Sequence, residues 1–238
     1  MKTLDQLKVK IFADGADLDG ILELYSNPLV AGFTTNPTLM RKSGISDYER
    51  FSRQVLEHIT DRPISFEVFS DEFDEMERQA RKIASWGKNV YVKIPVTNTR
   101  HESSVDLVRC LACEGIQLNV TALMTLEQVS VISEALKSYA PSYISVFAGR
   151  IADTGRDPMP LMKKAVEIMS SYKNQELIWA SPRELLNIFH ADEIGCHIIT
   201  VTHDLLKKLS FVGKDLDEFS LDTVKMFYED ARKAGYRL

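Results

Sequence analysis

The sequence of 238 residues has few of the residues that mark specialised protein classes. Three cysteines are too few for a disulfide scaffold, and eleven glycines with eight prolines exclude a collagen-like or linker-rich chain. No stretch approaches the roughly 18 consecutive apolar residues of a membrane-spanning helix. The first eight residues carry charge where a secretory signal needs an apolar core, so we expect a protein of the reducing cytoplasm.

The chain also lacks an excess of positive charge. Its 29 lysines and arginines stand against 34 aspartates and glutamates, which gives a net charge of -5. A molecule with this balance has no overall attraction for nucleic acid or for an anionic membrane, and we expect neither as a partner. A local cluster of arginine or lysine would therefore have to hold any anionic ligand.

Short apolar runs alternate with longer stretches of helical period along the whole chain. The apolar runs predict strands at residues 9–14, 30–35, 64–69, 90–96, 115–121, 143–147, 177–180 and 197–201. The stretches of helical period are residues 46–60, 71–86, 99–114, 125–139, 158–172 and 182–190. About eight strand-then-helix units in a chain near 250 residues are typical of an α/β protein with a (β/α)8 TIM barrel, and a doubly wound sheet is the alternative.

No linker or internal repeat divides the sequence, so we expect a single domain over residues 1–238. After the last predicted strand, an apolar helical pattern continues and predicts an extra C-terminal helix at about residues 214–235. Because such a helix must cover either the barrel mouth or a neighbouring subunit, we expect a homo-oligomer.

Two of the three cysteines form a C-x-x-C motif. Cys110 and Cys113 lie in a stretch of helical period, with no second cysteine pair and no histidine at a ligand spacing. We interpret them as two thiols on the flank of a helix and predict no metal site, with a metal or redox role as the alternative.

Three ionisable residues lie near the ends of predicted strands, where a barrel places its reactive groups. Lys93 lies in the apolar run 90–96, and burial there would favour the neutral amine that attacks a carbonyl. Asp14 and Glu67 lie near the ends of two other strands and would give and take protons. The alternatives are a lysine that reaches solvent and a structural cluster of ion pairs.

Several neutral polar residues also lie near strand ends. Thr34 and Asn36 precede Pro37 at a junction of strand and helix, where they could contact a ligand, although Asn36 could be only a helix cap. Asn119 and Thr121 lie on one face of a strand, an unusual pair for an apolar interior.

A phosphate group would suit two arginines that follow adjacent strands. Arg150 and Arg183 lie after the strands predicted at 143–147 and 177–180, and guanidinium forks match phosphate oxygens. Ser181 lies beside Arg183 and is either part of this site or a helix cap.

In their order along the chain, these motifs resemble those of the transaldolase family. The matching set is Asp14, Thr34-Thr35-Asn36-Pro37, Glu67, Lys93-Ile94-Pro95-Val96-Thr97, Asn119-x-Thr121, Gly149-Arg150 and Ser181-x-Arg183. The resemblance covers nearly the whole chain and implies the class I aldolase type of TIM barrel. The length is similar to that of the short members, which include fructose 6-phosphate aldolases. In these, the C-terminal helix commonly packs on a neighbouring subunit of a ring-built oligomer, which suggests a pentamer or decamer.

The resemblance also implies a role for each matched residue. Lys93 matches the Schiff-base lysine, and Asp14 matches the acid/base that acts on the sugar hydroxyl. Glu67 and Thr121 match the pair that holds the catalytic water. The expected substrate-binding residues are Thr34, Asn36, Asn119, Ser145 and Phe147 toward the dihydroxyacetone unit, and Arg150, Ser181 and Arg183 toward the phosphate. No metal or organic cofactor is implied, because the lysine itself supplies the electron sink.

Two positions separate the subfamilies that this chain resembles. The aldolases typically have Gln at the position of Glu67 and Tyr at that of Phe147, so this sequence has the transaldolase residue at both. The expected reaction, one of the pentose phosphate pathway, transfers dihydroxyacetone from sedoheptulose 7-phosphate or fructose 6-phosphate to erythrose 4-phosphate or glyceraldehyde 3-phosphate. The alternatives are a fructose 6-phosphate aldolase and a non-catalytic sugar-phosphate-binding barrel.

Departures from the family pattern concern the substrate more than the chemistry. Asp14 is followed by Gly-Ala-Asp where Thr-Ala/Ser-Asp/Asn is usual, and Ser181 is followed by proline. Thr-His-Asp at 202–204 replaces a turn that typically contains proline. These changes leave the donor and acceptor sugars open.

Overall fold

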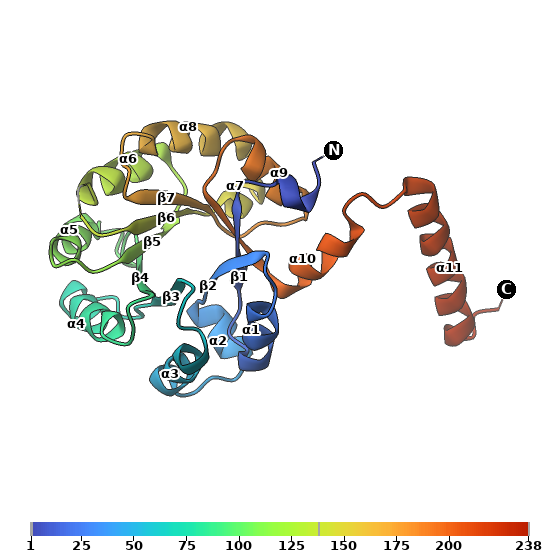
Figure 1. Cartoon of the computed structure of the whole chain (residues 1–238), viewed down its shortest axis with the longest axis horizontal. Helices are drawn as coiled ribbons and strands as arrows, with labels where there is room; N and C mark the ends of the chain where they lie inside the picture. The colour runs from blue at the N-terminus through green and yellow to red at the C-terminus, as the bar shows by residue number, and fades with distance from the viewer. Residues whose placement is uncertain (1, 138, 238) are drawn as a thin grey trace.

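The computed structural model of the chain describes residues 2–137 and 139–237. Eight parallel strands follow one another around a closed barrel, with helices on its outside (Figure 1). The first strand pairs with both the second and the eighth, which closes the sheet. The predicted (β/α)8 barrel is therefore confirmed, and the doubly wound alternative is wrong because an open sheet would leave two unpaired edges.

The strands lie where the short apolar runs predict them. They are β1 Lys10–Asp14, β2 Val30–Thr34, β3 Ile64–Glu67, β4 Val90–Pro95, β5 Leu118–Leu123, β6 Ser142–Val146, β7 Gln175–Trp179 and β8 Ile198–Thr202. Apolar side chains of these strands are buried both inside the barrel and against the helices. This burial on two faces explains why the strands appear in the sequence as nearly continuous apolar runs.

The helices outside the barrel include the six predicted ones. The helices of the barrel are α1 Leu18–Tyr25, α2 Pro37–Lys42, α3 Tyr48–His58, α4 Phe73–Ala84, α5 Val105–Cys113, α6 Leu126–Ala135, α7 Ala148–Ala152, α8 Met159–Met169, α9 Leu186–Glu193 and α10 His203–Lys207. The prediction omitted α1, whose start is marked by the Asp17 carboxylate accepting the Gly20 N–H at 2.8 Å. Position 138, near the end of the predicted helix 125–139, lies outside the described residues.

Two predicted helices begin too early. The stretch 99–114 becomes helical only at Val105, because Thr97 and Ser103 first form an antiparallel bridge and close a turn. The stretch 182–190 becomes helical only at Leu186. The loop that remains before α9 contains Ser181 and Arg183.

An aromatic layer fills the barrel below the ends of the strands. The rings of Tyr91 and Tyr143 stack with centroids 4.0 Å apart, and Phe12 meets Tyr143 edge-on at 5.7 Å. Gly32 leaves room for this layer, since a Cβ at that position would lie 2.6 Å from the Phe12 ring. Side chains alternate along a strand, so the next inward positions beyond these aromatic residues are polar. The aromatic layer is therefore an apolar floor beneath a polar end of the barrel.

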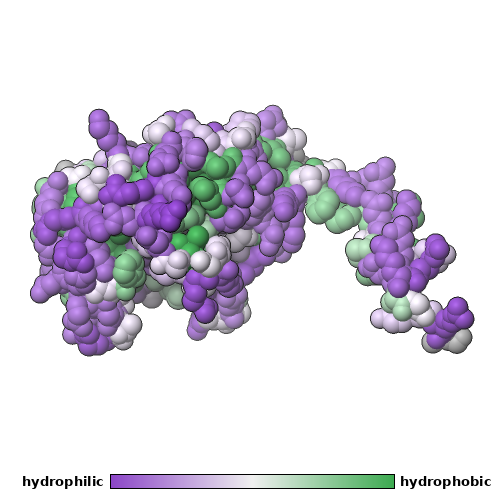
Figure 2. Space-filling model, turned by 90° about the horizontal axis from the view of Figure 1, so that it is seen from below, coloured by the Kyte–Doolittle hydropathy of each residue, from purple (hydrophilic) through white to green (hydrophobic). Residues whose placement is uncertain are grey.

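The chain ends in a long helix that stands away from the barrel. A short 3-10 turn, Lys208–Phe211, leads into α11 Leu216–Ala234, which projects as an arm (Figures 1 and 2). Every residue of α11 is exposed or half-buried, including Leu216, Val224 and Phe227 at 79%, 59% and 62% exposure. Among residues 2–137 and 139–237, no helix is long and apolar enough to cross a membrane.

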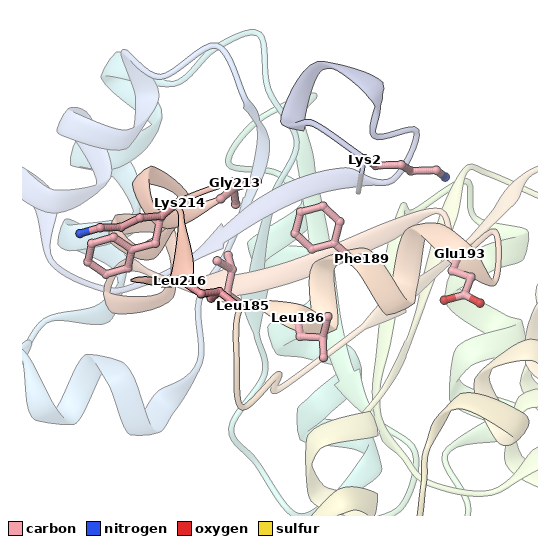
Figure 3. A pocket seen from close by; sticks show the side chains of 10 residues that line it. Lys2, Leu185, Leu186, Phe189, Glu193, Gly213, Lys214 and Leu216 are labelled. Atoms are coloured by element: carbon pink, nitrogen blue, oxygen red, sulfur yellow. The ribbon is translucent and has the colours of Figure 1, made fainter. Parts of the chain in front are cut away.

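An apolar cavity lies at the root of this arm. Its volume is about 530 Å³, and it is lined from one side by α9 and from the other by the segment that leads into α11 (Figure 3). Leu185, Leu186 and Phe189 supply much of its wall. The arm and this cavity together expose an apolar surface that residues 2–137 and 139–237 leave uncovered.

Candidate active site

Lys93 lies inside the polar end of the barrel with two oxygen partners. Only 6% of the residue is exposed. Its Nζ donates to the carbonyl oxygen of Thr35 at 2.9 Å and lies 3.0 Å from Oε2 of Glu67. Glu67 and Lys93 are direct neighbours in the register of β3 and β4, so their side chains point to the same side of the sheet. The two predicted catalytic residues therefore form a buried contact.

Asp14 stands at the end of β1 in a network of hydroxyl and amide groups. The Thr34 hydroxyl donates to Oδ1 of Asp14 at 2.8 Å and lies 2.5 Å from the hydroxyl of Thr200. Burial among protein atoms raises the pKa of the Asp14 carboxyl, while the charge of Lys93 and the bond from Thr34 oppose this shift. Burial therefore favours the neutral form of this carboxyl, and its charged and polar neighbours favour the carboxylate.

Asn36 is a helix cap, as one of its two interpretations predicts, and it also lies beside Asp14. Its Oδ1 accepts the N–H of Leu39 at 2.9 Å, so it is the cap of α2. Its Nδ2 is directed at Oδ2 of Asp14, at 3.4 Å. The helix cap therefore fixes an amide group beside the carboxyl of β1.

A second network crosses the barrel from β3 to β6. Asn119 donates from Nδ2 to the hydroxyl of Ser65 at 2.9 Å and accepts the hydroxyl of Ser145 at 2.7 Å. All three residues are buried. Because each is held by its neighbour, the orientation of the Asn119 amide is set by the protein.

Thr121 lies at an irregularity of β5. The pairing of β5 with β6 shifts between Val120 and Leu123, and Ala122 has a φ of +65°. A non-glycine residue in this region signals local strain, and a bulge of this kind redirects the side chains beside it. The hydroxyl of Thr121 is buried and has no hydrogen-bond partner within residues 2–137 and 139–237, so it is available to a small polar ligand.

Both candidate phosphate-binding arginines lie beside one carboxylate. Arg183 donates from Nε to Oδ1 of Asp153 at 2.8 Å and from Nη1 to the Ser181 hydroxyl at 3.1 Å. The bond from Arg183, with a smaller effect of the Arg150 charge, holds the pKa of Asp153 below its usual range. A carboxylate that the sequence analysis did not single out thus orders this cationic corner.

Close backbone packing brings the two arginine loops together. A Cβ on Gly149 would lie 1.5 Å from the carbonyl oxygen of Ser181, so only glycine lets α7 approach the loop after β7. Ser181 has a φ of +59°, and α9 begins at Leu186, so Ser181 does not cap a helix. Phe147 directly precedes α7, is half-buried and packs against the aromatic floor.

A cavity of about 340 Å³ lies beside Asp14, between the ends of β1 and β8 and the helices α1 and α2. Lys42, Thr202, His203 and Asp204 also line it. Sequence reasoning did not assign a site role to Lys42 or to Thr200, because nothing in their local patterns separates them from ordinary helix and strand residues. The alternating pattern of β8 is the one signal that could have placed Thr200 inside the barrel.

One group of side chains away from the barrel mouth has donor atoms at a spacing suited to a metal ion. Glu77, Cys110 and Glu114 bring one such atom each within 4.8 Å of one another. Arg81 pairs with Glu77 at 2.5 Å and with Glu114 at 2.7 Å, so a guanidinium already occupies the place between the two carboxylates. Cys110 and Cys113 are both exposed thiols on α5.

Comparisons with solved structures reflect the barrel alone. The chain is similar to a putative lyase/mutase from Burkholderia cenocepacia, with a TM-score of 0.59 and 11% identity over 97% of this chain and 85% of the other. It is also similar to 3-keto-L-gulonate-6-phosphate decarboxylase from Vibrio cholerae, with a TM-score of 0.55 and 11% identity over 82% and 88% of the two chains. At such identity, a shared fold says nothing of a shared reaction.

Sequence comparison is more specific. The chain is 34% identical to a probable transaldolase of a Thermoanaerobacter species over 231 residues, which are 97% of this chain and 100% of the relative. It is 37% identical to probable transaldolase 2 of Listeria monocytogenes over 202 residues, 84% of this chain and 88% of the relative. The model of the family described as Transaldolase/Fructose-6-phosphate aldolase matches residues 11–238. With the barrel and its buried lysine in place, these matches show that the chain belongs to the transaldolase/fructose-6-phosphate aldolase family.

Proposed function

We propose that this protein is a transaldolase in which Lys93 forms a Schiff base with a ketose phosphate. The observation that carries the proposal is the buried contact of the Lys93 amine with Glu67, 3.0 Å away, at the mouth of a barrel. A lysine in such a site can supply the electron sink for breaking a carbon–carbon bond without a metal or an organic cofactor. A binding protein would need the two arginines but has no use for a buried amine.

Imine formation requires proton transfers that Glu67 is placed to perform. Nζ of Lys93 must lose a proton before it attacks the C2 carbonyl of the substrate, and the Glu67 carboxylate is an acceptor within 3.0 Å. The carbinolamine then loses water. In our proposal, Glu67 passes the proton that it took from Nζ to the hydroxyl group that leaves as water. The transfer runs through a water held by the buried Thr121 hydroxyl, which has no partner among the described protein groups.

Cleavage follows with Asp14 as the base. The protonated imine withdraws electrons, Asp14 takes the proton of the C4 hydroxyl, and the bond between C3 and C4 breaks. An aldose phosphate leaves, and the dihydroxyacetone unit stays on Lys93 as an enamine that attacks the aldehyde of a second aldose phosphate. Asn36, Thr34 and the amide of Asn119 would orient the hydroxyl groups of the three-carbon unit.

The substrate phosphate is proposed to lie at the cationic corner. Asp153 holds Arg183 through both Nε and Nη2, and Ser181 accepts from Nη1, which leaves one N–H on each Nη to bind phosphate oxygens beside Arg150. Because the site is locally cationic, the overall charge of -5 does not oppose an anionic substrate. Anions would be attracted here over a Debye length of about 8 Å at physiological salt.

A second copy of the chain is the proposed cover for α11. Most of the stability of a helix in a protein comes from packing of its apolar face, and α11 gains little from contact with its own barrel. We therefore propose a cytoplasmic homo-oligomer, a pentamer or decamer, in which the arm packs on a neighbouring subunit.

We expect borohydride to trap fructose 6-phosphate on Lys93. Digestion and mass spectrometry should find the reduced adduct on the Lys93 peptide, because the imine forms only on an amine that can lose its proton next to the carbonyl. Lys93→Met should abolish the adduct, whereas Lys88→Met, which removes an exposed lysine just before β4, should retain it. Binding of the sugar phosphate with no adduct on wild-type Lys93 would instead favour a non-catalytic barrel.

Turnover of fructose 6-phosphate should depend on an acceptor. With fructose 6-phosphate alone, release of glyceraldehyde 3-phosphate should stop after about one equivalent per subunit, because the enamine stays on Lys93. Addition of erythrose 4-phosphate should restore steady turnover, measured as glyceraldehyde 3-phosphate release in a coupled assay. Sustained release of free dihydroxyacetone without acceptor would identify an aldolase.

Phe147→Tyr, which introduces the residue typical of the aldolases, should raise the release of free dihydroxyacetone.

Asp14→Asn should lower kcat by about a thousandfold, since it removes a general base, yet stabilise the fold by about 1 kcal/mol at neutral pH. Because the pKa of Asp14 is raised in the folded state, this carboxyl binds more protons in the native protein than in the unfolded chain, and its own contribution to stability falls as the pH rises above about 4. Denaturant unfolding of both proteins from pH 4 to 8 should show the advantage of the variant growing with pH. A variant that is less stable than wild type at pH 7 would contradict this.

Sedimentation should give a mass that is a multiple of the 27.0 kDa subunit. Val224→Asp should disperse the oligomer, because it places a charge on the apolar side of α11, whereas Glu229→Gln on the same helix should leave it intact. A wild-type protein that sediments as a 27.0 kDa monomer at micromolar concentration would exclude the proposed assembly.

A further inference from the structure

The ladder between β2 and β3 stops one hydrogen bond short of Glu67. The N–H of Thr35 donates to the carbonyl of Ser65 at 3.1 Å, which is the final backbone bond of this pair. In a parallel ladder that continued, the carbonyl of Thr35 would next accept the N–H of Glu67. The chain instead turns into α2 at Pro37.

Two other groups occupy the places of that missing bond. The carbonyl of Thr35 accepts Nζ of Lys93 at 2.9 Å. The N–H of Glu67 donates to the hydroxyl oxygen of Tyr48 at 2.7 Å, and the Tyr48 hydroxyl donates to the carbonyl of Glu67 at 2.9 Å. Tyr48 thus replaces the next rung of the ladder for both backbone groups of Glu67.

Tyr48 is held in this position by helix and aromatic packing. It is the first residue of α3, directly after Asp47, whose carboxylate caps the helix. Its ring lies 5.4 Å from that of Phe69, 6.0 Å from Trp86 and 6.4 Å from Phe66, measured between centroids. Burial raises the pKa of the Tyr48 hydroxyl, so it stays protonated and able to donate.

We propose that Tyr48 is a positioning residue for the chemistry of Lys93, because its hydroxyl satisfies the backbone of Glu67 and so reserves the Thr35 carbonyl for the lysine amine. This inference rests on the proposed function for its catalytic consequence. Both oxygen partners of Nζ depend on the hydroxyl: it fixes the strand end that carries the Glu67 carboxylate, and it removes the N–H that would compete for Thr35.

Phenylalanine at position 48 would keep the aromatic packing and lose only the two hydrogen bonds to the backbone of Glu67. The N–H of Glu67 would then be left without its acceptor, and an unsatisfied backbone donor away from water is unfavourable, so it would seek another acceptor. The ladder geometry directs the N–H of Glu67 toward the carbonyl of Thr35. Closure of that bond would draw the end of β3 toward β2 and displace Nζ of Lys93.

The test compares Tyr48→Phe with Tyr172→Phe. The control also removes one tyrosine hydroxyl, which donates to Glu134 at 3.1 Å. Tyr172 lies between α8 and the start of β7, at the opposite end of the barrel from Lys93. Both variants are assayed well below their unfolding temperatures for kcat, KM and the single-turnover rate of borohydride trapping. A displacement of about 1 Å can cost about 100-fold in rate.

We expect Tyr48→Phe to lower kcat and the trapping rate in parallel, by roughly 10-fold to 100-fold, with KM for fructose 6-phosphate within about twofold of wild type. Tyr172→Phe should leave both rates unchanged. A purely structural role would lower the unfolding temperature and leave kcat as it is in wild type, and that outcome overturns the proposal.

A crystal structure of Tyr48→Phe decides the inference separately from the proposed function. We expect Nζ of Lys93 to lose its contact with Thr35 or with Glu67, and a structure that retains both at wild-type distances overturns the inference. If wild-type Lys93 traps no sugar at all, the Schiff-base function fails, while the geometry of the variant still supports or overturns the positioning role of Tyr48.

Discussion

A buried lysine amine between a backbone carbonyl and a carboxylate is the contact on which the rest of the site depends. Removal of an ammonium group from water costs several kcal/mol, which close oxygen partners must offset. Lys93 has two such partners, Thr35 directly after β2 and Glu67 at the end of β3. The direct register of Glu67 with Lys93 sets one of these contacts, and the early end of β2 frees the other. These contacts offset the cost of burying the Lys93 ammonium group, and one of them places a proton acceptor beside the amine. Stability and the proposed chemistry therefore depend on the same geometry.

The polar end of the barrel is stiff because an aromatic floor supports it. Phe12, Tyr91 and Tyr143 each precede a site residue by two positions on β1, β4 and β6, and their rings pack against one another. Aromatic side chains have only two rotatable bonds, and close packing restricts them further. The packed rings therefore limit how far the next inward side chains can move toward the barrel interior. Above them, the hydroxyl and amide groups of Ser65, Asn119 and Ser145 satisfy each other. A substrate would therefore meet donors and acceptors that are already oriented, which lowers the free-energy cost of binding it.

Much of this arrangement could be predicted from sequence because it repeats along the chain. Alternation of apolar strands and helical stretches predicts a barrel, and the period of two places Lys93 and Glu67 on inward faces near strand ends. Asp153 and Tyr48 were beyond such reasoning. Each lies in a helical or loop segment whose local pattern is ordinary, and each acquires its importance from a contact across the fold, with Arg183 or with the backbone of Glu67. The late start of α9 was hidden for a similar reason, since the loop at Ser181 is shaped by its close packing against Gly149.

Where the protein leaves a polar group unsatisfied is as informative as where it satisfies one. Asp14 receives bonds from Thr34 and Asn36, and the interior hydroxyls near it are paired. Thr121 differs, since its buried hydroxyl has no protein partner among residues 2–137 and 139–237 and follows directly from a bulge that strains Ala122. An unpaired buried hydroxyl and a strained backbone each cost about 1 to 3 kcal/mol. The two costs fall on neighbouring residues of β5, and they support our proposal that Thr121 and Glu67 hold the water of the imine chemistry.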